Sequence, residues 1–148
     1  MKPPRRDIKI EIANEQRVLS FDRHLVRRAI TKVLNGADVQ KASISVAVVD
    51  DATIARLNWN HLRHRGPADV LSFLLDDSDG LEGEIVIGAE TAIREAPRYG
   101  WSAKEEMLLY VVHGTLHLVG EDDRTARQRA EMQRREREVL LELGIERK

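Results

Sequence analysis

Two histidines, His113 and His117, lie four residues apart in a largely apolar run over residues 107–119. A helix start signal precedes this run, because Ser102 and Glu105 have the spacing of a capping box. Residues four apart on a helix share one face, with Cβ atoms about 5–6 Å apart, so both imidazoles can reach one metal ion at about 2.0–2.1 Å. The pattern therefore predicts a helix that presents two metal ligands.

The residues after this run include candidates for a third ligand. Gly120 favours an end to the helix, and the turn that follows can bring Asp122 or Asp123 back towards the two imidazoles. Three protein ligands and an open coordination position are typical of a catalytic zinc site. The alternative is a pair of partly buried histidines that bind no metal, and the glycine followed by acidic residues favours the metal site.

Gly114 narrows the chemistry of such a site. In the helix of a zinc protease, the residue after the first histidine is a glutamate that acts as the general base. This chain has Gly114 there, although its pattern otherwise matches the extended zinc-protease motif with Asp123 as the third ligand. We therefore predict a metal site that lacks the usual base for peptide hydrolysis.

Composition limits the class of protein. The 148 residues are expected to form one domain over residues 1–148, and 33% charged and 42% apolar residues are typical of a soluble globular protein. The net charge of −1 gives no overall attraction for nucleic acid, and the lack of cysteine excludes disulfides and thiolate zinc sites. No apolar run is long enough to span a membrane, and none follows the basic residues near the N-terminus, so we expect a cytoplasmic protein with no membrane contact.

Hydrophobic periodicity predicts the elements that position these residues. Apolar patterns predict strands over residues 8–12, 42–49, 70–75 and 84–88. We expect the third strand to be buried on both faces and to form a hairpin with the fourth. Helical spacing and capping signals predict helices over residues 22–35, after 50–51, over 91–99, over 102–119 and over 124–143. The expected fold is α+β, with one small mixed four-stranded sheet, about five helices packed against it and the metal-site helix in the centre.

Two segments of the chain are rich in charge. Residues 58–69 form a basic segment that we expect to be irregular, and Arg63 and Arg65 beside Trp59 suit phosphate contacts and base stacking. A solvated loop without a ligand is the alternative for this segment. Residues 124–143 mix basic and acidic side chains, which is typical of a solvated helix with internal ion pairs.

Residues 113–123 resemble a known family. Their sequence is similar to the His-Gly-x-Leu-His-Leu-x-Gly-Tyr-Asp-His signature of the YbeY family of single-strand-specific, metal-dependent endoribonucleases. Residues 57–58 and 67–73 resemble the family's Leu-Asn and Pro-Thr-Asp-Val-Leu-Ser-Phe motifs, and residues 83–87 resemble its Gly-Asp-Ile-Val-Ile motif. The motifs follow the family's order, and the resemblance covers roughly residues 40–125.

This resemblance implies an rRNA maturation factor that acts on the 3′ end of small-subunit rRNA and in ribosome quality control. It implies single-stranded rRNA and the small ribosomal subunit as partners, and one Zn2+ ion per chain as cofactor. His113 and His117 match two zinc ligands of the family, whereas the third ligand, a histidine in the family, falls on Asp123, and the tyrosine position falls on Glu121. An aspartate ligand would make zinc a weaker Lewis acid and would admit manganese more readily.

The resemblance leaves the position of one arginine open. The family has an arginine, thought to serve catalysis, four residues past the asparagine of its Leu-Asn motif. Counted from Asn58, this position is Leu62, so either the adjacent Arg63 takes the role or the arginine is missing. We expect Arg63, or Arg65 close by, to stabilise charge on the phosphate during cleavage.

The residues leave three functions open. The first is metal-dependent cleavage of RNA that lies between the basic segment and the metal helix, for which Asp69 and Glu121 are only weak candidates as general base. The second is a ribosome assembly or binding factor that keeps the metal as a structural or vestigial site, because Leu62 and Asp123 depart from the family pattern. The third is a metal-dependent hydrolase of another substrate, and Gly114 argues against peptides.

Overall fold

Four strands form one mixed sheet in the order β1-β2-β4-β3 in the computed structural model, which describes residues 6–146. β1 pairs in parallel with β2, β2 pairs in parallel with β4, and β3 pairs in antiparallel with β4. The strands are β1 (Asp7–Glu15), β2 (Lys41–Val49), β3 (Val70–Asp76) and β4 (Leu81–Gly88). The predicted mixed sheet and hairpin are confirmed, whereas residues 1–5, which include most of the basic residues near the N-terminus, lie outside the described residues.

Local capping signals set where the helices begin. Asp22 and Asp50 accept backbone N–H bonds at the starts of α1 and α2, Ser102 and Glu105 form a capping box at the start of α4, and a second capping box on Thr125 starts α5. The helices are α1 (Arg23–Gly36), α2 (Asp51–Leu62), α3 (Ala89–Glu95), the 3-10 helix η1 (Ala96–Tyr99), α4 (Ala103–Leu118) and α5 (Ala126–Glu142). The predicted set of about five helices is confirmed. Within residues 6–146, no helix has the length and apolar character needed to cross a bilayer.

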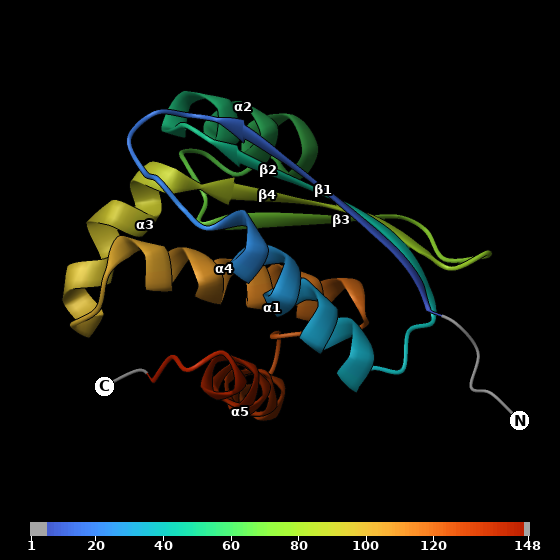
Figure 1. Ribbon diagram of the computed structural model, residues 1–148. Coiled ribbons are helices and arrows are strands. Elements are labelled where there is room, and N and C mark those ends of the chain that lie inside the picture. The colour runs from blue at the N-terminus through green and yellow to red at the C-terminus, as the bar shows by residue number, and fades with distance from the viewer. Residues whose placement is uncertain (1–5, 147–148) are drawn as a thin grey trace, which may run out of the picture.

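Helices cover the two faces of the sheet unequally (Figure 1). α2 lies on one face, α1 and α4 lie on the other, and α5 lies beyond α4. The larger hydrophobic core lies between the sheet and α1, α4 and α5, whereas a smaller cluster under α2 is built on Val49, Ile54, Leu71 and Val86. α4 contacts α1, α3, α5, β3 and β4, so the helix that carries the two histidines is central, as predicted.

Gly114 brings α4 close to the sheet. A Cβ atom at this position would lie 2.9 Å from Ser72 Oγ and 3.0 Å from side-chain atoms of Val70 and Ile85. The Ser72 hydroxyl also donates a hydrogen bond of 2.9 Å to the Gly114 carbonyl. The lack of a side chain at position 114 therefore sets the distance between α4 and strands β3 and β4.

Two expectations about individual segments are wrong. β3 is not buried on both faces, because it is an edge strand: Leu71 is buried, but Leu74 and Leu75 are 51% and 54% exposed. Residues 58–62 are not irregular but form the end of α2, which stops at Leu62 with Arg63 as its C-cap. The irregular part of the basic segment therefore starts only at Arg63.

α5 confirms one expectation and corrects another. Internal ion pairs link Arg134 to Glu131 and Glu138 on the exposed side of the helix, as predicted for a solvated helix. Glu136 does not follow this pattern, because it is only 8% exposed. One carboxylate of this highly charged helix is therefore buried against the rest of the protein.

Candidate metal centre

His113, His117 and Asp123 bring one donor atom each to a common point. The Nε2 atoms of the two histidines are 3.2 Å apart, and each lies 3.6 Å from Asp123 Oδ2. Ligand atoms about 2.0–2.1 Å from a tetrahedral zinc ion lie about 3.3–3.4 Å from one another. The three donor atoms therefore have the spacing of three corners of a zinc coordination shell, and this group, called the metal centre below, can hold a metal ion.

The metal centre is open to solvent on one side. The side chains of His113, His117 and Asp123 are 27%, 29% and 42% exposed. Three protein ligands with an accessible fourth position are typical of catalytic zinc sites, whereas structural sites are closed by four protein ligands. The exposure of the metal centre therefore fits a role in catalysis.

The turn after α4 selects between the two aspartates. Gly120 adopts a left-handed conformation with φ 101°, and its N–H donates to the His117 carbonyl at 3.1 Å, which closes the helix end. Asp122 accepts the Asp123 N–H at 2.8 Å and pairs with Arg124 at 3.2 Å. Asp122 thereby stabilises the turn, and Asp123 is the aspartate that reaches the imidazoles.

Glu136 is the residue at this site that sequence analysis missed. Its Oε2 atom lies 2.8 Å from His113 Nδ1, on the side of the ring opposite the metal centre. Burial lowers the pKa of His113, but the hydrogen bond and charge of Glu136, together with the charges of Asp69 and Asp123, raise it by more, so the pKa lies above its ordinary value. The sequence does contain a signal that Glu136 is buried. Glu136 lies four residues from Met132 and four from Leu140, so it shares a helix face with these two apolar residues, which are both buried.

The two weak candidates for a general base lie near the metal centre without joining it. The negative charge of Asp69 contributes to the raised pKa of His113 and of Tyr110, while its own Oδ1 atom accepts the Val70 N–H at 2.7 Å. Burial raises the pKa of Glu121, and the charge of Arg135, 4.0 Å away, partly opposes this effect. Within residues 6–146, neither carboxylate forms an ion pair with His113 or the other imidazole.

The predicted arginines gather around Trp59 instead. The guanidinium carbons of Arg63 and Arg65 lie 5.6 Å and 5.9 Å from the centre of the Trp59 ring, which is within cation–π range. Residues 59–67 are all exposed, including Leu62 at the position of the family arginine. In the described part of the chain, no ion pair joins either arginine to Asp123. Trp59, Arg63 and Arg65, called the Trp59 cluster below, form a basic and aromatic surface.

Comparisons with known proteins identify the family. A family model described as Endoribonuclease YbeY matches residues 11–144. Three proteins named Endoribonuclease YbeY are similar to this chain. The protein from Rhodopirellula baltica is 46% identical to it over 109 aligned residues, that from Chloroherpeton thalassium 37% over 118, and that from Symbiobacterium thermophilum 36% over 156. These matches cover 72%, 80% and 95% of this chain.

The coverage of the relatives differs. The match spans 56% of the Rhodopirellula protein, 84% of the Chloroherpeton protein and 100% of the Symbiobacterium protein. The fold is similar to the solution structure of TM1509 from Thermotoga maritima, with a TM-score of 0.63, 24% identity and coverage of 91% of each chain. The resemblance inferred from the sequence motifs is confirmed, and the chain belongs to the YbeY endoribonuclease family.

Proposed function

We propose that this chain is a metal-dependent endoribonuclease that cuts single-stranded rRNA in the maturation of the 3′ end of small-subunit rRNA. The observation that carries the proposal is the tetrahedral spacing of three donor atoms in an open site, in a chain of this family. The small ribosomal subunit, a role in ribosome quality control and a cytoplasmic location belong to the same proposal. Residues 1–148 act as one domain in this proposal.

His113, His117 and Asp123 would hold one zinc ion per chain. The ion would act as a Lewis acid on a phosphate oxygen and lower the pKa of a bound water. The carboxylate of Asp123 adds a negative charge that a third histidine would not, and this charge favours harder metals such as manganese. The donor set of two imidazoles and one carboxylate therefore fits zinc and also admits manganese.

The Trp59 cluster would bind the RNA strand. The exposed Trp59 ring, 43% exposed, offers a face on which an unpaired base can stack, and Arg63 and Arg65 offer guanidinium groups for the phosphates. Only an unpaired base has a free face, which supports single-stranded RNA as substrate. We assign Arg63 the role of stabilising the charge that develops on the phosphate, because it follows directly on the position of the family arginine.

Asp69 connects the two parts of the proposed active site. It is the last residue of the basic segment, whose irregular part starts at Arg63, and its negative charge contributes to the raised pKa of His113 in the metal centre. RNA bound along residues 63–69 would therefore approach the metal centre from the Trp59 cluster. Gly114 stands where a zinc protease has its catalytic glutamate, and any side chain there would crowd Ser72, Val70 and Ile85, which favours a nuclease over a protease.

The test combines metal content with RNA cleavage, for the purified wild type and for Asp123→Ala. We expect about one zinc ion per chain in the wild type, and loss of both metal and single-stranded RNA cleavage in the variant. Equal metal content in the two proteins would remove Asp123 from the metal centre. Metal without cleavage would overturn the nuclease proposal and favour the assembly factor, and a protease assay with and without chelator tests the peptide alternative.

A further inference from the structure

Glu136 occupies an unusual position for an acidic residue of α5. Glu131 and Glu138 lie towards solvent and pair with arginines of the same helix. Glu136 is 8% exposed and lies on the face of α5 that packs against α4. A buried carboxylate is costly unless it is paired and hydrogen-bonded, so its partner decides what this residue contributes.

The partner of Glu136 is a residue of the metal centre. His113 places its two ring nitrogens in different surroundings: Nδ1 lies 2.8 Å from Glu136 Oε2, and Nε2 faces His117 and Asp123. An ionised carboxylate only accepts hydrogen bonds, so the neutral ring carries its proton on Nδ1. The lone pair on Nε2 is then free for a metal ion.

The two histidines of the metal centre are not equivalent. Every polar contact recorded for the His117 ring within residues 6–146 uses Nε2, on the side of His113 and Asp123. His113 is therefore the imidazole that is held from both sides, and the second side belongs to α5. Glu136 therefore makes a contact with the metal centre that Glu131 and Glu138, the exposed acids paired with Arg134, do not make.

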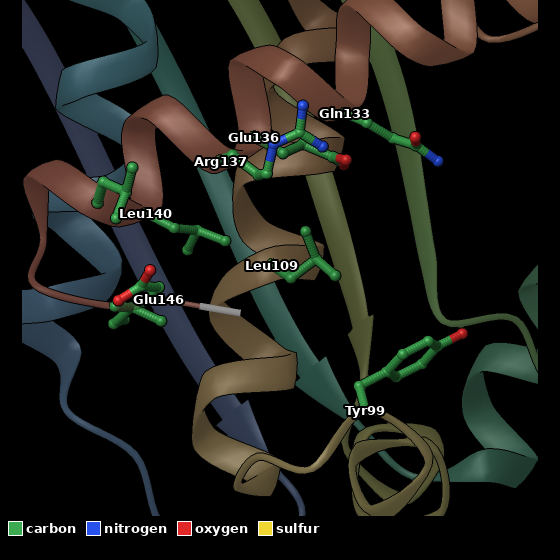
Figure 2. Close-up of a pocket in the computed structure, with 9 residues that line it drawn as sticks. Tyr99, Leu109, Gln133, Glu136, Arg137, Leu140 and Glu146 are labelled. Atoms are coloured by element: carbon green, nitrogen blue, oxygen red, sulfur yellow. The ribbon is translucent and has the colours of Figure 1, made fainter. Parts of the chain in front are cut away.

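Glu136 has a basic partner in His113, and it also lines the wall of a pocket. Glu136 borders a pocket of about 500 Å3 between α4 and α5, whose walls include Tyr99, Leu109 and Leu140 (Figure 2). Arg137 also lines this pocket, but among residues 6–146 the ion pair recorded for Glu136 is with His113. The pocket provides space beside the carboxylate, so a substitution here need not displace α5.

We propose that Glu136 is a positioning residue, which orients His113 for metal binding so that α5 completes the metal centre. This inference rests on the proposed function, because it assigns a role towards the metal. Carboxylates that accept the second N–H of a metal-bound histidine fix the ring and raise its basicity, and their loss typically weakens metal affinity about 10–100-fold. The affinity for metal would then depend on a helix that contributes no ligand.

The experiment is a titration of the metal-free full chain with Zn2+ in competition with a chromophoric chelator. Glu136→Ala removes both the charge and the acceptor, and we expect its Kd for Zn2+ to rise about 100-fold. Glu136→Gln keeps an acceptor oxygen, so a rise of about tenfold is expected. Glu131→Gln is the matched control, because it removes an exposed acid from the same helix, and its Kd should stay at the wild-type value.

A second measurement separates positioning from a purely structural role. Nitrogen chemical shifts of His113 in the metal-free protein report which ring nitrogen carries the proton. At a pH where the ring is neutral, we expect the Nδ1–H form in the wild type and in Glu131→Gln, and a mixture of tautomers in Glu136→Ala. Circular dichroism checks folding, and if Glu136→Ala does not fold, Glu136→Gln carries the test.

The outcomes distinguish this inference from the proposed function. Wild type that binds Zn2+ and cleaves RNA, together with Glu136 variants whose Kd and His113 tautomer match the wild type, would overturn the inference alone. Wild type that binds no Zn2+ would overturn both. Weaker Zn2+ binding confined to the Glu136 variants would support the role of α5 in the metal centre.

Discussion

The metal centre and the Trp59 cluster differ in how firmly the fold holds them. His113 is fixed from both sides, by Glu136 and by the other donor residues, and it lies on the central helix of the fold. The Trp59 cluster lies at the end of α2, where residues 59–67 are all exposed. The Arg63 N–H donates a backbone hydrogen bond of 3.0 Å to the Trp59 carbonyl, but the side chains of the cluster contact one another through cation–π contacts of Trp59 with two arginines, which are weak at exposed sites.

This difference fits the division of work in the proposed function. A metal ion needs ligands at fixed distances, and a rigid helix with a closed turn provides them. A single strand of RNA varies in conformation, and exposed arginines and an indole can adjust to it. We therefore expect substitutions in the metal centre to abolish chemistry, and substitutions in the Trp59 cluster to weaken chemistry or binding in graded steps.

His113→Ala should have the largest effect. It removes a ligand and the partner of Glu136 together, so we expect Zn2+ affinity to fall by more than about 100-fold and RNA cleavage to fall to background. Metal analysis and a single-stranded RNA cleavage assay measure the two effects. His24→Ala is the control, because His24 is an exposed histidine near the start of α1. Full activity of His113→Ala would show that His113 is not a ligand of a catalytic metal ion.

Arg63→Ala should have the next largest effect. Its comparison with Arg65→Ala shows which of the two arginines stabilises charge on the phosphate. If Arg63 stabilises charge on the phosphate, its loss should lower kcat about 10²–10³-fold, as for the loss of other groups that stabilise a transition state. Arg65→Ala should lower kcat/KM only a few-fold, because it would lose one phosphate contact of ordinary strength. Both variants should keep wild-type zinc content. A larger fall in kcat for Arg65→Ala would reverse the assignment.

Trp59→Ala should have the smallest effect and should act on binding alone. Stacking of a base on an aromatic side chain contributes about 1–3 kcal/mol, so we expect KM for single-stranded RNA to rise roughly tenfold while kcat changes little. Trp59→Phe keeps an aromatic face and should restore most of the affinity. Steady-state kinetics separate the two parameters, and a fall in kcat with unchanged KM would place Trp59 outside substrate binding.

Local signals in the sequence predict much of this fold. Capping residues such as Asp22 and Ser102 mark helix starts, and a glycine such as Gly120 marks a helix end, because these effects act within a few residues. The pairing of His113 with His117 follows from helix geometry in the same way. Features of this kind need no knowledge of the tertiary structure.

Features that depend on how elements pack are harder to predict from the sequence. The spacing of Glu136 with Met132 and Leu140 indicates a buried face, but its partner on α4 is known only once α5 is placed against α4. Leu74 and Leu75 look like core residues until β3 is found at the edge of the sheet. Which of the two aspartates joins the metal centre likewise depends on the exact path of the turn after Gly120.

The close contact at Gly114 has a consequence for the evolution of this motif. The residue after the first histidine carries the catalytic glutamate in zinc proteases, but here Val70 and Ile85, whose branched side chains are stiff, lie against this position. A glutamate could be accommodated only if these side chains shifted or if α4 moved away from β3 and β4. A single mutation to glutamate would therefore add the protease base only together with a repacking of this contact, so the histidine motif and the packing of α4 on the sheet would have to change together.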